Sequence, residues 1–329
     1  MQRLKLLSWI VFIAVPAFAW GQAPAKPRLL APGILTVIPS DPHEEEMYSG
    51  PRQLVEIPAN FGNIGKVKPN YEPLSKTINE QSKVAILRRT IWNLEFAFKP
   101  LRMMYIDVPQ ATGKMQRKLI WYMVYRVKNN GKHWKPVEKA DEFGHLTFDK
   151  EMVDMPLRFF PQFVLQAHEF EGKQYLDRVV PAAIGPIKKR ELPDKDLFDS
   201  LTISGMEIPV SEERADKSVW GVVTWEDVDP RIDYCSVYIQ GLTNAYQFDD
   251  PPGAYKTGSP PATGRKFVQK TLQLNFWRPG DAIDESEEEV RYGVRIINEV
   301  GEKKREVEQK RIFDLYGVKD RLDSLWIYR

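Results

Sequence analysis

Four carboxylates lie close together in one stretch of the sequence, at Glu226, Asp227, Asp229 and Asp233. Asp229 precedes Pro230, a dipeptide that favours a turn, so we expect the group in a loop between two strands. Oxygen ligands gathered in a loop can bind calcium. The central glycine of an EF-hand loop is missing, and a solvated acidic turn is the simpler interpretation. Calcium is kept as a hypothesis for this loop.

The histidines point to no particular chemistry. The chain has four, at positions 43, 133, 145 and 168, and no two have a metal-binding spacing such as His-x-x-x-His. A zinc site assembled in space from His133, His145 and His168 is an alternative to three separate surface or loop histidines. No Gly-x-Ser-x-Gly elbow, P-loop or dinucleotide fingerprint occurs, so no catalytic or cofactor-binding residue is assigned. A carboxylate pair for glycoside hydrolysis depends on distances in space that the sequence does not contain.

One tryptophan is a candidate for recognition rather than for packing. Trp277 and Arg278 end a predicted strand, and Asp281 follows the turn at Pro279-Gly280. Such a pair at a strand end can form an exposed recognition corner. Most other aromatic residues are expected to fill the core. The single cysteine, Cys235, lies on the apolar face of a predicted strand and is interpreted as a buried small hydrophobic residue.

The elements that must position these residues have the pattern of strands. Residues 90–98, 101–108 and 119–127 show the period-two alternation of strands. Both faces of 119–127 are apolar, so both are expected to be covered. Asn129-Asn130-Gly131 follows as a hairpin-turn signal, because its residues accept positive φ. Further strands are expected at residues 159–167 and 174–180.

The second half of the chain is again rich in strand patterns. We expect them at residues 219–225, 233–240, 267–277, 290–297, 304–313 and 325–328, with 290–297 and 304–313 joined as a hairpin. Short strands at roughly 8–12-residue spacing, separated by turn signals, are typical of β-sandwiches. The predicted fold class is therefore all-β, with two tandem antiparallel β-sandwich domains of immunoglobulin or fibronectin type.

Composition suggests the boundaries of these domains. Residues 1–19 are interpreted as a signal peptide and residues 20–85 as a Pro-rich tail with an irregular lead-in, which buries little. The first sandwich domain is expected over 86–182 and the second over 217–329. Residues 183–216 carry several prolines and a charged run, and are predicted to be a linker.

The first residues predict export. Two basic residues precede an apolar run over Leu6–Val15, and Pro16 leads into the small-residue site Ala17-Phe18-Ala19. The run is about half of the roughly 20 residues that a membrane-spanning helix needs. We therefore expect cleavage after Ala19, or alternatively after Gly21, and no transmembrane segment in the mature chain.

Cysteine and charge usage narrow the compartment and the partners. A single cysteine cannot form an intrachain disulfide, and no Asn-x-Ser/Thr sequon occurs. Together these features favour bacterial export, to the periplasm or the cell surface. Without Arg3 and Lys5 the chain keeps 45 of its 47 Lys and Arg residues against 45 Asp and Glu residues. That balance argues against a nucleic-acid binder, which needs a basic surplus.

Three functions fit these observations. The leading hypothesis is an exported, non-catalytic protein that binds a protein or another cell-envelope component. A carbohydrate-binding or carbohydrate-active protein is an alternative, and it requires exposed aromatic side chains in a row or cleft. A calcium-stabilised adhesion-type module is the other alternative. Formation of a homo-oligomer through an edge strand is compatible with all three.

Overall fold

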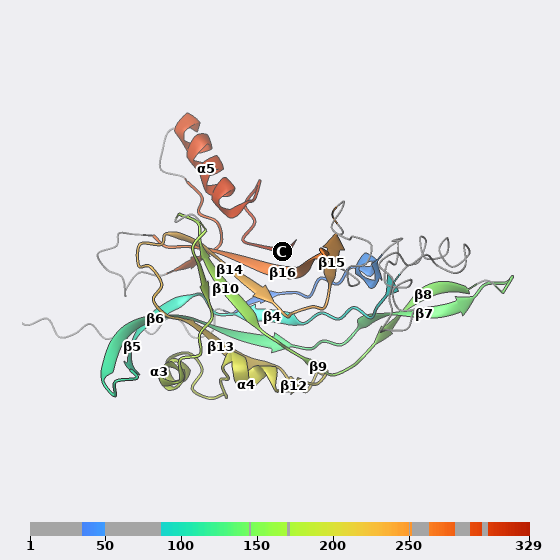
Figure 1. Ribbon diagram of the computed structural model, residues 1–329, viewed down its shortest axis with the longest axis horizontal. Coiled ribbons are helices and arrows are strands. Elements are labelled where there is room, and N and C mark those ends of the chain that lie inside the picture. The colour runs from blue at the N-terminus through green and yellow to red at the C-terminus, as the bar shows by residue number, and fades with distance from the viewer. Residues whose placement is uncertain are drawn as a thin grey trace, which may run out of the picture. The chain divides into compact units, whose positions relative to one another are not determined.

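Figure 1 shows the computed structural model of the chain, which describes residues 35–49, 87–144, 146–169, 172–249, 251, 263–279, 290–297 and 302–329. The chain divides into two compact units, residues 1–32 and 33–329, and every described residue belongs to the second. The predicted signal peptide, residues 1–19, lies outside the described residues. Strands dominate the described part, and its named strands pair antiparallel, as the sequence predicts.

The first sheet is organised around β6 (Met115–Lys128), which has neighbours on both edges. β13 (Val219–Trp225) pairs with one edge. The other edge pairs with β5 (Arg102–Pro109) and then with β4 (Glu95–Phe98). β1 (Thr36–Ile38) continues the sheet beyond β4.

The second sheet is organised in the same way around β16 (Lys266–Trp277). One edge of β16 pairs with β14 (Tyr234–Gln240) and β15 (Tyr246–Asp249). The other edge pairs with β17 (Arg291–Tyr292) and β18 (Ser324–Tyr328). Beyond β14 the sheet continues through β10 (Gln162–Ala167) and β11 (Gln174–Leu176).

The inner faces of the two sheets pack against each other over one apolar core. Phe163 of β10 contacts Phe96 and Tyr125 of the first sheet, with ring centroids 6.3 and 5.0 Å away. Phe98 of the first sheet meets Phe276 of the second at 5.9 Å. Each fully buried side chain of this size contributes about 2–3 kcal/mol, so the contact between the sheets is the main source of stability.

This packing corrects the predicted division into domains. β6 lies within residues 86–182 and its partner β13 within 217–329, and the paired strands β10 and β14 are divided in the same way. Strands from both segments share both sheets and one core, so the described residues do not form two tandem sandwiches. The physical reason is that β6 and β14 are central strands, whose backbone groups need hydrogen-bonding neighbours on both edges.

Residues 183–216 are part of the folded body rather than a linker. They include most of α3 (Pro181–Glu191), all of α4 (Ser200–Ser204) and β12 (Glu207–Ile208), which pairs with β9 (Leu157–Arg158). Pro181 occupies the first helical position of α3, where a missing N–H costs nothing.

α3 covers the outer face of the first sheet. Its Ala183 and Ile187 are fully buried against the side chains of β6 that point away from the inner core, Ile120, Tyr122 and Val124. Both faces of β6 are therefore covered, which confirms the prediction made from its alternation.

Residues 35–49 contradict the expectation that the tail buries little. β1 pairs with β4, and a short 3-10 helix, η1 (Glu44–Met47), leads into β2 (Tyr48–Ser49). β2 in turn pairs with β3 (Leu87–Arg88). Met47 is fully buried, so this segment belongs to the folded body.

The second sheet carries a helix where the sequence predicts a strand. α5 (Glu302–Tyr316) replaces the strand expected over 304–313, because good helix formers fill the segment and Ile312 and Tyr316 share one helix face. Both are buried with Tyr234 on the outer face of the second sheet. In the part of the chain that the structure describes, no helix combines the length and apolarity needed to cross a bilayer.

The turn at Asn129-Asn130-Gly131 does not close the predicted hairpin. Gly131 adopts φ 64°, as the turn signal requires, but β6 does not pair with the strand that follows. That strand, β7 (His133–Ala140), pairs with β8 (Leu146–Val153). Figure 1 shows β7 and β8 projecting from the two sheets as a two-stranded arm, residues 133–153, which we call the arm.

A glycine in β13 tests the core packing. Gly221 pairs with Tyr125 of β6, and a Cβ at this position would overlap the Tyr125 ring. We expect Gly221→Ala to cost about 1–3 kcal/mol of unfolding free energy in urea, because the ring is held by neighbouring aromatic side chains. Gly185→Ala is the control, since a Cβ added to that exposed glycine would meet no atom within 4 Å apart from the adjacent residues and backbone of α3. Equal stability of the two variants would contradict the packing.

Candidate functional site

The carboxylates of the predicted calcium loop face basic side chains. Glu226 lies 2.8 Å from Lys118 Nζ and 3.0 Å from a guanidinium nitrogen of Arg178. Asp227 lies 3.3 Å from the same Lys118 Nζ. Lys118 comes from β6, 109 residues away in sequence, and the hydrogen bond to Glu226 raises its pKa.

The two later carboxylates are paired as well. Asp229 lies 2.9 Å from Arg231, whose hydrogen bonds lower the pKa of Asp229 to about 2. Asp233 lies 4.0 Å from Arg278. Nowhere in the described ranges do three or more His, Cys, Asp or Glu side chains come together as a metal site. The loop neutralises neighbouring cations, and calcium binding there has no structural support beyond the residue types.

The recognition corner predicted at Trp277 and Arg278 is not an exposed pair. Arg278 is 3% exposed and donates a hydrogen bond to the carbonyl oxygen of Pro230. Trp277 is half-buried, and Arg291 and Arg295 lie 5.1 and 5.3 Å from its ring. Asp281 lies outside the described residues. Arg278 therefore holds the 226–233 loop instead of facing a ligand.

The tryptophans in the described part of the chain are buried or half-buried. Trp121 and Trp225 are buried in the core between the sheets, as the sequence predicts. The other tryptophans in the described ranges, at positions 92, 134, 220, 277 and 326, are half-buried. Cys235 is 2% exposed, which confirms its interpretation as a buried hydrophobic residue, and burial raises the pKa of its thiol.

The histidines are separated from one another. His43 is exposed and lies 3.0 Å from Asp41, whereas His133 is buried and lies 3.1 Å from Asn129 Oδ1. His145 lies outside the described residues. His168 forms a third, independent contact, with Ser236 Oγ at 2.7 Å from its Nε2. The described histidines therefore do not share a site.

His168 and Ser236 have the chemistry of a base and a nucleophile, but the hydrogen bonds around them prevent that use. Ser236 is 0% exposed and donates its single hydroxyl proton to Asn275 Oδ1 at 2.7 Å. Asn275 Nδ2 donates to the Leu322 carbonyl at 2.7 Å, and Gln273 Nε2 donates to the same Oδ1. His168 Nε2 must then donate to Ser236 Oγ, so His168 is not poised to remove its proton.

This polar network fixes the C-terminal part of the chain to the second sheet. Gln273 Nε2 also donates to the Tyr316 carbonyl at the end of α5, at 3.1 Å. The Tyr316 ring meets the His168 ring edge to face at 4.9 Å, and its hydroxyl donates to the Phe276 carbonyl. The hydrogen bonds of the buried Gln273 and Asn275 amides therefore attach α5 and residues 316–322 to the second sheet.

His168 makes the network sensitive to acid. Burial lowers the pKa of His168 to about 4, from 6.5 when exposed, so its stabilisation is complete above pH 6.5 and is lost as the pH falls towards 4. We expect unfolding free energies measured across this range to fall by up to about 3 kcal/mol through this group. His168→Gln, which keeps a side-chain N–H donor, should remove this part of the pH dependence of the unfolding free energy. Parallel profiles for both proteins would contradict the assignment.

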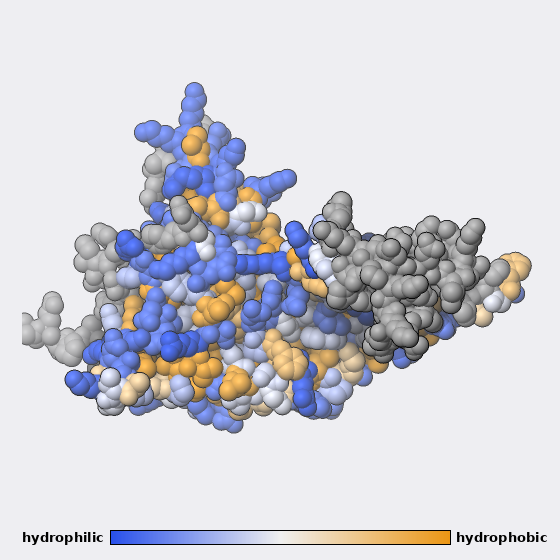
Figure 2. All heavy atoms as spheres, viewed as in Figure 1, coloured by the Kyte–Doolittle hydropathy of each residue, from blue (hydrophilic) through white to orange (hydrophobic). Residues whose placement is uncertain are grey.

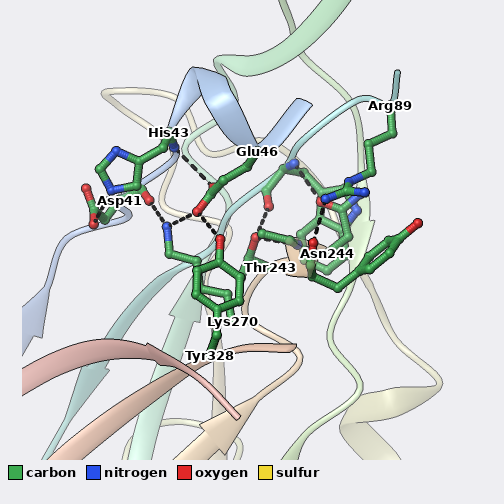
Figure 3. Close-up of polar contacts among 11 residues, drawn as sticks. Asp41, His43, Glu46, Arg89, Thr243, Asn244, Lys270 and Tyr328 are labelled. Atoms are coloured by element: carbon green, nitrogen blue, oxygen red, sulfur yellow. Dashed lines mark hydrogen bonds and ion pairs between the residues drawn. The ribbon is translucent and has the colours of Figure 1, made fainter. Parts of the chain in front are cut away.

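A second polar cluster joins residues 41–46 to the second sheet (Figure 3). Lys270 of β16 and Glu46 of η1 are 3% and 8% exposed, and Lys270 Nζ lies 2.6 Å from Glu46 Oε1. Tyr328 donates its hydroxyl to the same Oε1 at 2.9 Å, and the His43 backbone N–H donates to Oε2 at 3.1 Å. Lys270 Nζ also donates to the Asp41 carbonyl. Each charge is thus paired and hydrogen-bonded within the protein.

The neighbouring groups in Figure 3 fix the residues that lead into β4. Asn244 accepts a hydrogen bond from the Trp92 backbone N–H at 3.0 Å and donates to the Thr90 carbonyl at 2.8 Å. Thr243 Oγ1 donates to the Trp92 carbonyl, and Arg89 donates to the Tyr246 carbonyl, both at 2.8 Å. Residues 89–92 therefore lie firmly against the turn between β14 and β15.

We expect the buried Lys270–Glu46 ion pair to couple the effects of substitutions at these two positions. Lys270→Met or Glu46→Gln alone leaves one buried polar group without its partner, and each is expected to cost about 3 kcal/mol in urea unfolding. The double variant should cost clearly less than the sum. Lys139→Met, which breaks the exposed Lys139–Asp149 pair of the arm, is the control and should cost less than about 1 kcal/mol. Additive effects at positions 46 and 270 would contradict the coupling.

η1 and residues 88–91 hold the base of the arm. Ile91 and Trp134 exchange backbone hydrogen bonds of 2.8 and 3.0 Å. Lys150 pairs with Glu44 of η1 and lies 4.9 Å from the Trp134 ring, while Arg88 lies over the Phe148 ring. The base of the arm is therefore fixed to the body.

Asn129 fixes the point at which the chain leaves β6 for the arm. It is fully buried, and its Nδ2 donates to the carbonyls of Met155 and Ile208 at 2.9 and 3.0 Å. Its Oδ1 accepts from the Gly131 backbone N–H at 3.0 Å. One side chain thus joins the start of the arm, the segment after it and β12.

One face of the arm and its tip present apolar side chains. Trp134 pairs with Met152 across the two strands and lies on the same face as Phe148, whereas Lys139 and Asp149 lie on the opposite face. Met152 is 56% exposed, and Phe143 in the connecting loop is 83% exposed.

The loop at the tip and the edge of β7 limit how the arm can make contacts. Asp141 Oδ1 accepts the Phe143 backbone N–H at 2.9 Å, and the Asp141 carbonyl accepts from Gly144 at 3.0 Å, so the loop that carries Phe143 has a defined turn. Pro136 and the lysines of β7 disfavour the addition of another strand at that edge. The tip and the exposed Met152 are left as the contact surfaces. Sequence reasoning missed this surface because Pro136 interrupts the alternation of β7.

The comparisons with known proteins add no relationship. No protein-family model, no curated protein and no solved structure matches this chain.

Proposed function

We propose that this chain is an exported, non-catalytic protein that binds a partner protein at the cell envelope, and that the arm makes the contact. The observation that carries the proposal is the arm itself. Its base is fixed by Asn129, Trp134 and Lys150, and its tip carries the most exposed large hydrophobic side chain among the described residues, Phe143. An exposed aromatic side chain is a typical anchor of protein interfaces, because it buries a large area and loses little conformational entropy when it binds.

Export is supported by the sequence of residues 1–19, with its apolar run and small-residue cleavage site. The low cysteine content fits a bacterial periplasmic or surface protein. In the described part of the chain, a non-catalytic role is supported by the surroundings of the side chains that could do chemistry. Ser236 and His168 are locked in a hydrogen-bonded network, and the carboxylates of residues 226–233 face cations.

The proposal is tested by photo-crosslinking in cells of the source organism. A photoreactive phenylalanine analogue at position 143 should give one discrete adduct with another protein. The same analogue at Phe160, which is 62% exposed outside the arm, is the control and should not give that adduct. Phe143→Asp should abolish the complex while leaving the melting temperature within about 1 °C, since exposed substitutions change stability little.

Two results would overturn the proposal. Adducts that are equally abundant from positions 143 and 160 would show that the arm has no special role. An adduct of twice the chain's own mass would assign the arm to self-association instead of partner binding.

A further inference from the structure

A groove lies beside α5, on the outer side of the second sheet. It has a volume of about 610 Å³ and lies between the N-terminal half of α5 and the segment before it. Its lining consists of Tyr234, Arg295, Ile297, Lys303, Lys304, Val307 and Glu308. This surface is separate from the arm, so an inference about it does not depend on the function proposed above.

The lining of the groove is basic. Arg295, Lys303 and Lys304 face a single acidic side chain, Glu308. Arg311 neutralises that carboxylate with hydrogen bonds of 3.1 and 3.2 Å from its Nε, which lower the pKa of Glu308. The positive charge of the groove is therefore not balanced by its own lining.

Arg295 is held in place before any ligand arrives. Its Nη1 donates to the Tyr234 hydroxyl at 3.2 Å, and its guanidinium lies 5.3 Å from the Trp277 ring. The backbone of the same segment is tied to α5, because Gln309 Nε2 donates to the Arg295 carbonyl and its Oε1 accepts from the Ile297 N–H. A fixed guanidinium is well suited to a carboxylate, which it can bind with two parallel hydrogen bonds.

Apolar surface accompanies these charges. Val307 is 72% exposed on α5, and Tyr234 and Ile297 line the same groove. Figure 2 shows hydrophilic residues over most of the visible surface of α5, with isolated hydrophobic residues among them. A ligand that satisfies both parts of the lining must carry negative charges and apolar side chains close together.

We propose that this groove binds a segment of a partner protein in which carboxylates alternate with apolar side chains. The groove on the other side of α5 supplies the internal comparison. That groove has a volume of about 660 Å³, and its basic residues Arg305, Lys310 and Lys319 are nearly balanced by Glu306 and Asp314. The excess of basic side chains is therefore larger in the groove that contains Arg295.

The test measures binding of a fluorescein-labelled peptide of Leu-Glu-Glu repeats, about four repeats long, to the full chain by fluorescence anisotropy. We expect saturable binding that weakens as salt rises. The Arg295→Gln, Lys303→Gln and Lys304→Gln triple variant should bind about tenfold more weakly. The Lys310→Gln and Lys319→Gln double variant, on the other side of α5, should bind like the wild type.

A second variant tests the groove without changing Arg295, which also contacts Tyr234 and Trp277. Val307→Glu changes an exposed side chain, leaves the buried face of α5 intact, and should also weaken binding about tenfold by adding a like charge. Replacing Glu by Gln in the peptide, or Leu by Ser, should each abolish measurable binding.

Three outcomes would overturn the proposal. One is no binding of the Leu-Glu-Glu peptide at low salt. Another is equal weakening by the variants on both sides of α5. The third is binding of phosphatidylglycerol vesicles, lost in the triple variant, in the absence of peptide binding, which would assign the groove to an anionic lipid surface.

Discussion

The structure depends on the requirement that β6 be hydrogen-bonded along both edges. β6 is 14 residues long, and its central side chains are buried on both faces, between the inner core on one side and α3 on the other. Backbone groups in such a position have no access to water, so each must pair within the protein. β4 and β5 supply one edge and β13 the other. Because β13 comes almost 100 residues later in the chain, this requirement joins the two halves of the sequence into one body.

The surface features follow from this body. The chain leaves β6 at Asn129, whose buried amide directs it into the arm, and η1 and residues 88–91 hold the base of the arm. On the opposite sheet, the network of Ser236, Gln273 and Asn275 attaches α5, which forms one wall of the basic groove. Buried, satisfied polar groups therefore determine where the exposed surfaces lie. The two proposed binding surfaces differ in character, since one is an exposed aromatic tip and the other a basic groove.

The sequence predicts many of the strands but not their partners. Alternation identified the strands that became β6, β13, β14, β16 and β18, and it showed that both faces of β6 are covered. Period-two alternation reports which face a side chain occupies and contains no information about the neighbouring strand, so the two-domain division was wrong. α5 was missed because residues 304–313 follow a turn signal at 298–301, which suggested a hairpin with residues 290–297. For the site, the acidic loop was found, but its partner Lys118 lies 109 residues away and gives no local signal.

Native-state hydrogen exchange of the full chain tests the central claim, that strands from both halves form one cooperative body from which the arm projects. The amides of β6 and β13 should exchange with the same opening free energy as those of β10 and β14, equal to the free energy of global unfolding. The amides of the distal arm, beyond Pro136, should exchange through a separate local opening of lower free energy. Two distinct opening free energies for β6 and β14, or an arm as protected as the core, would contradict the account.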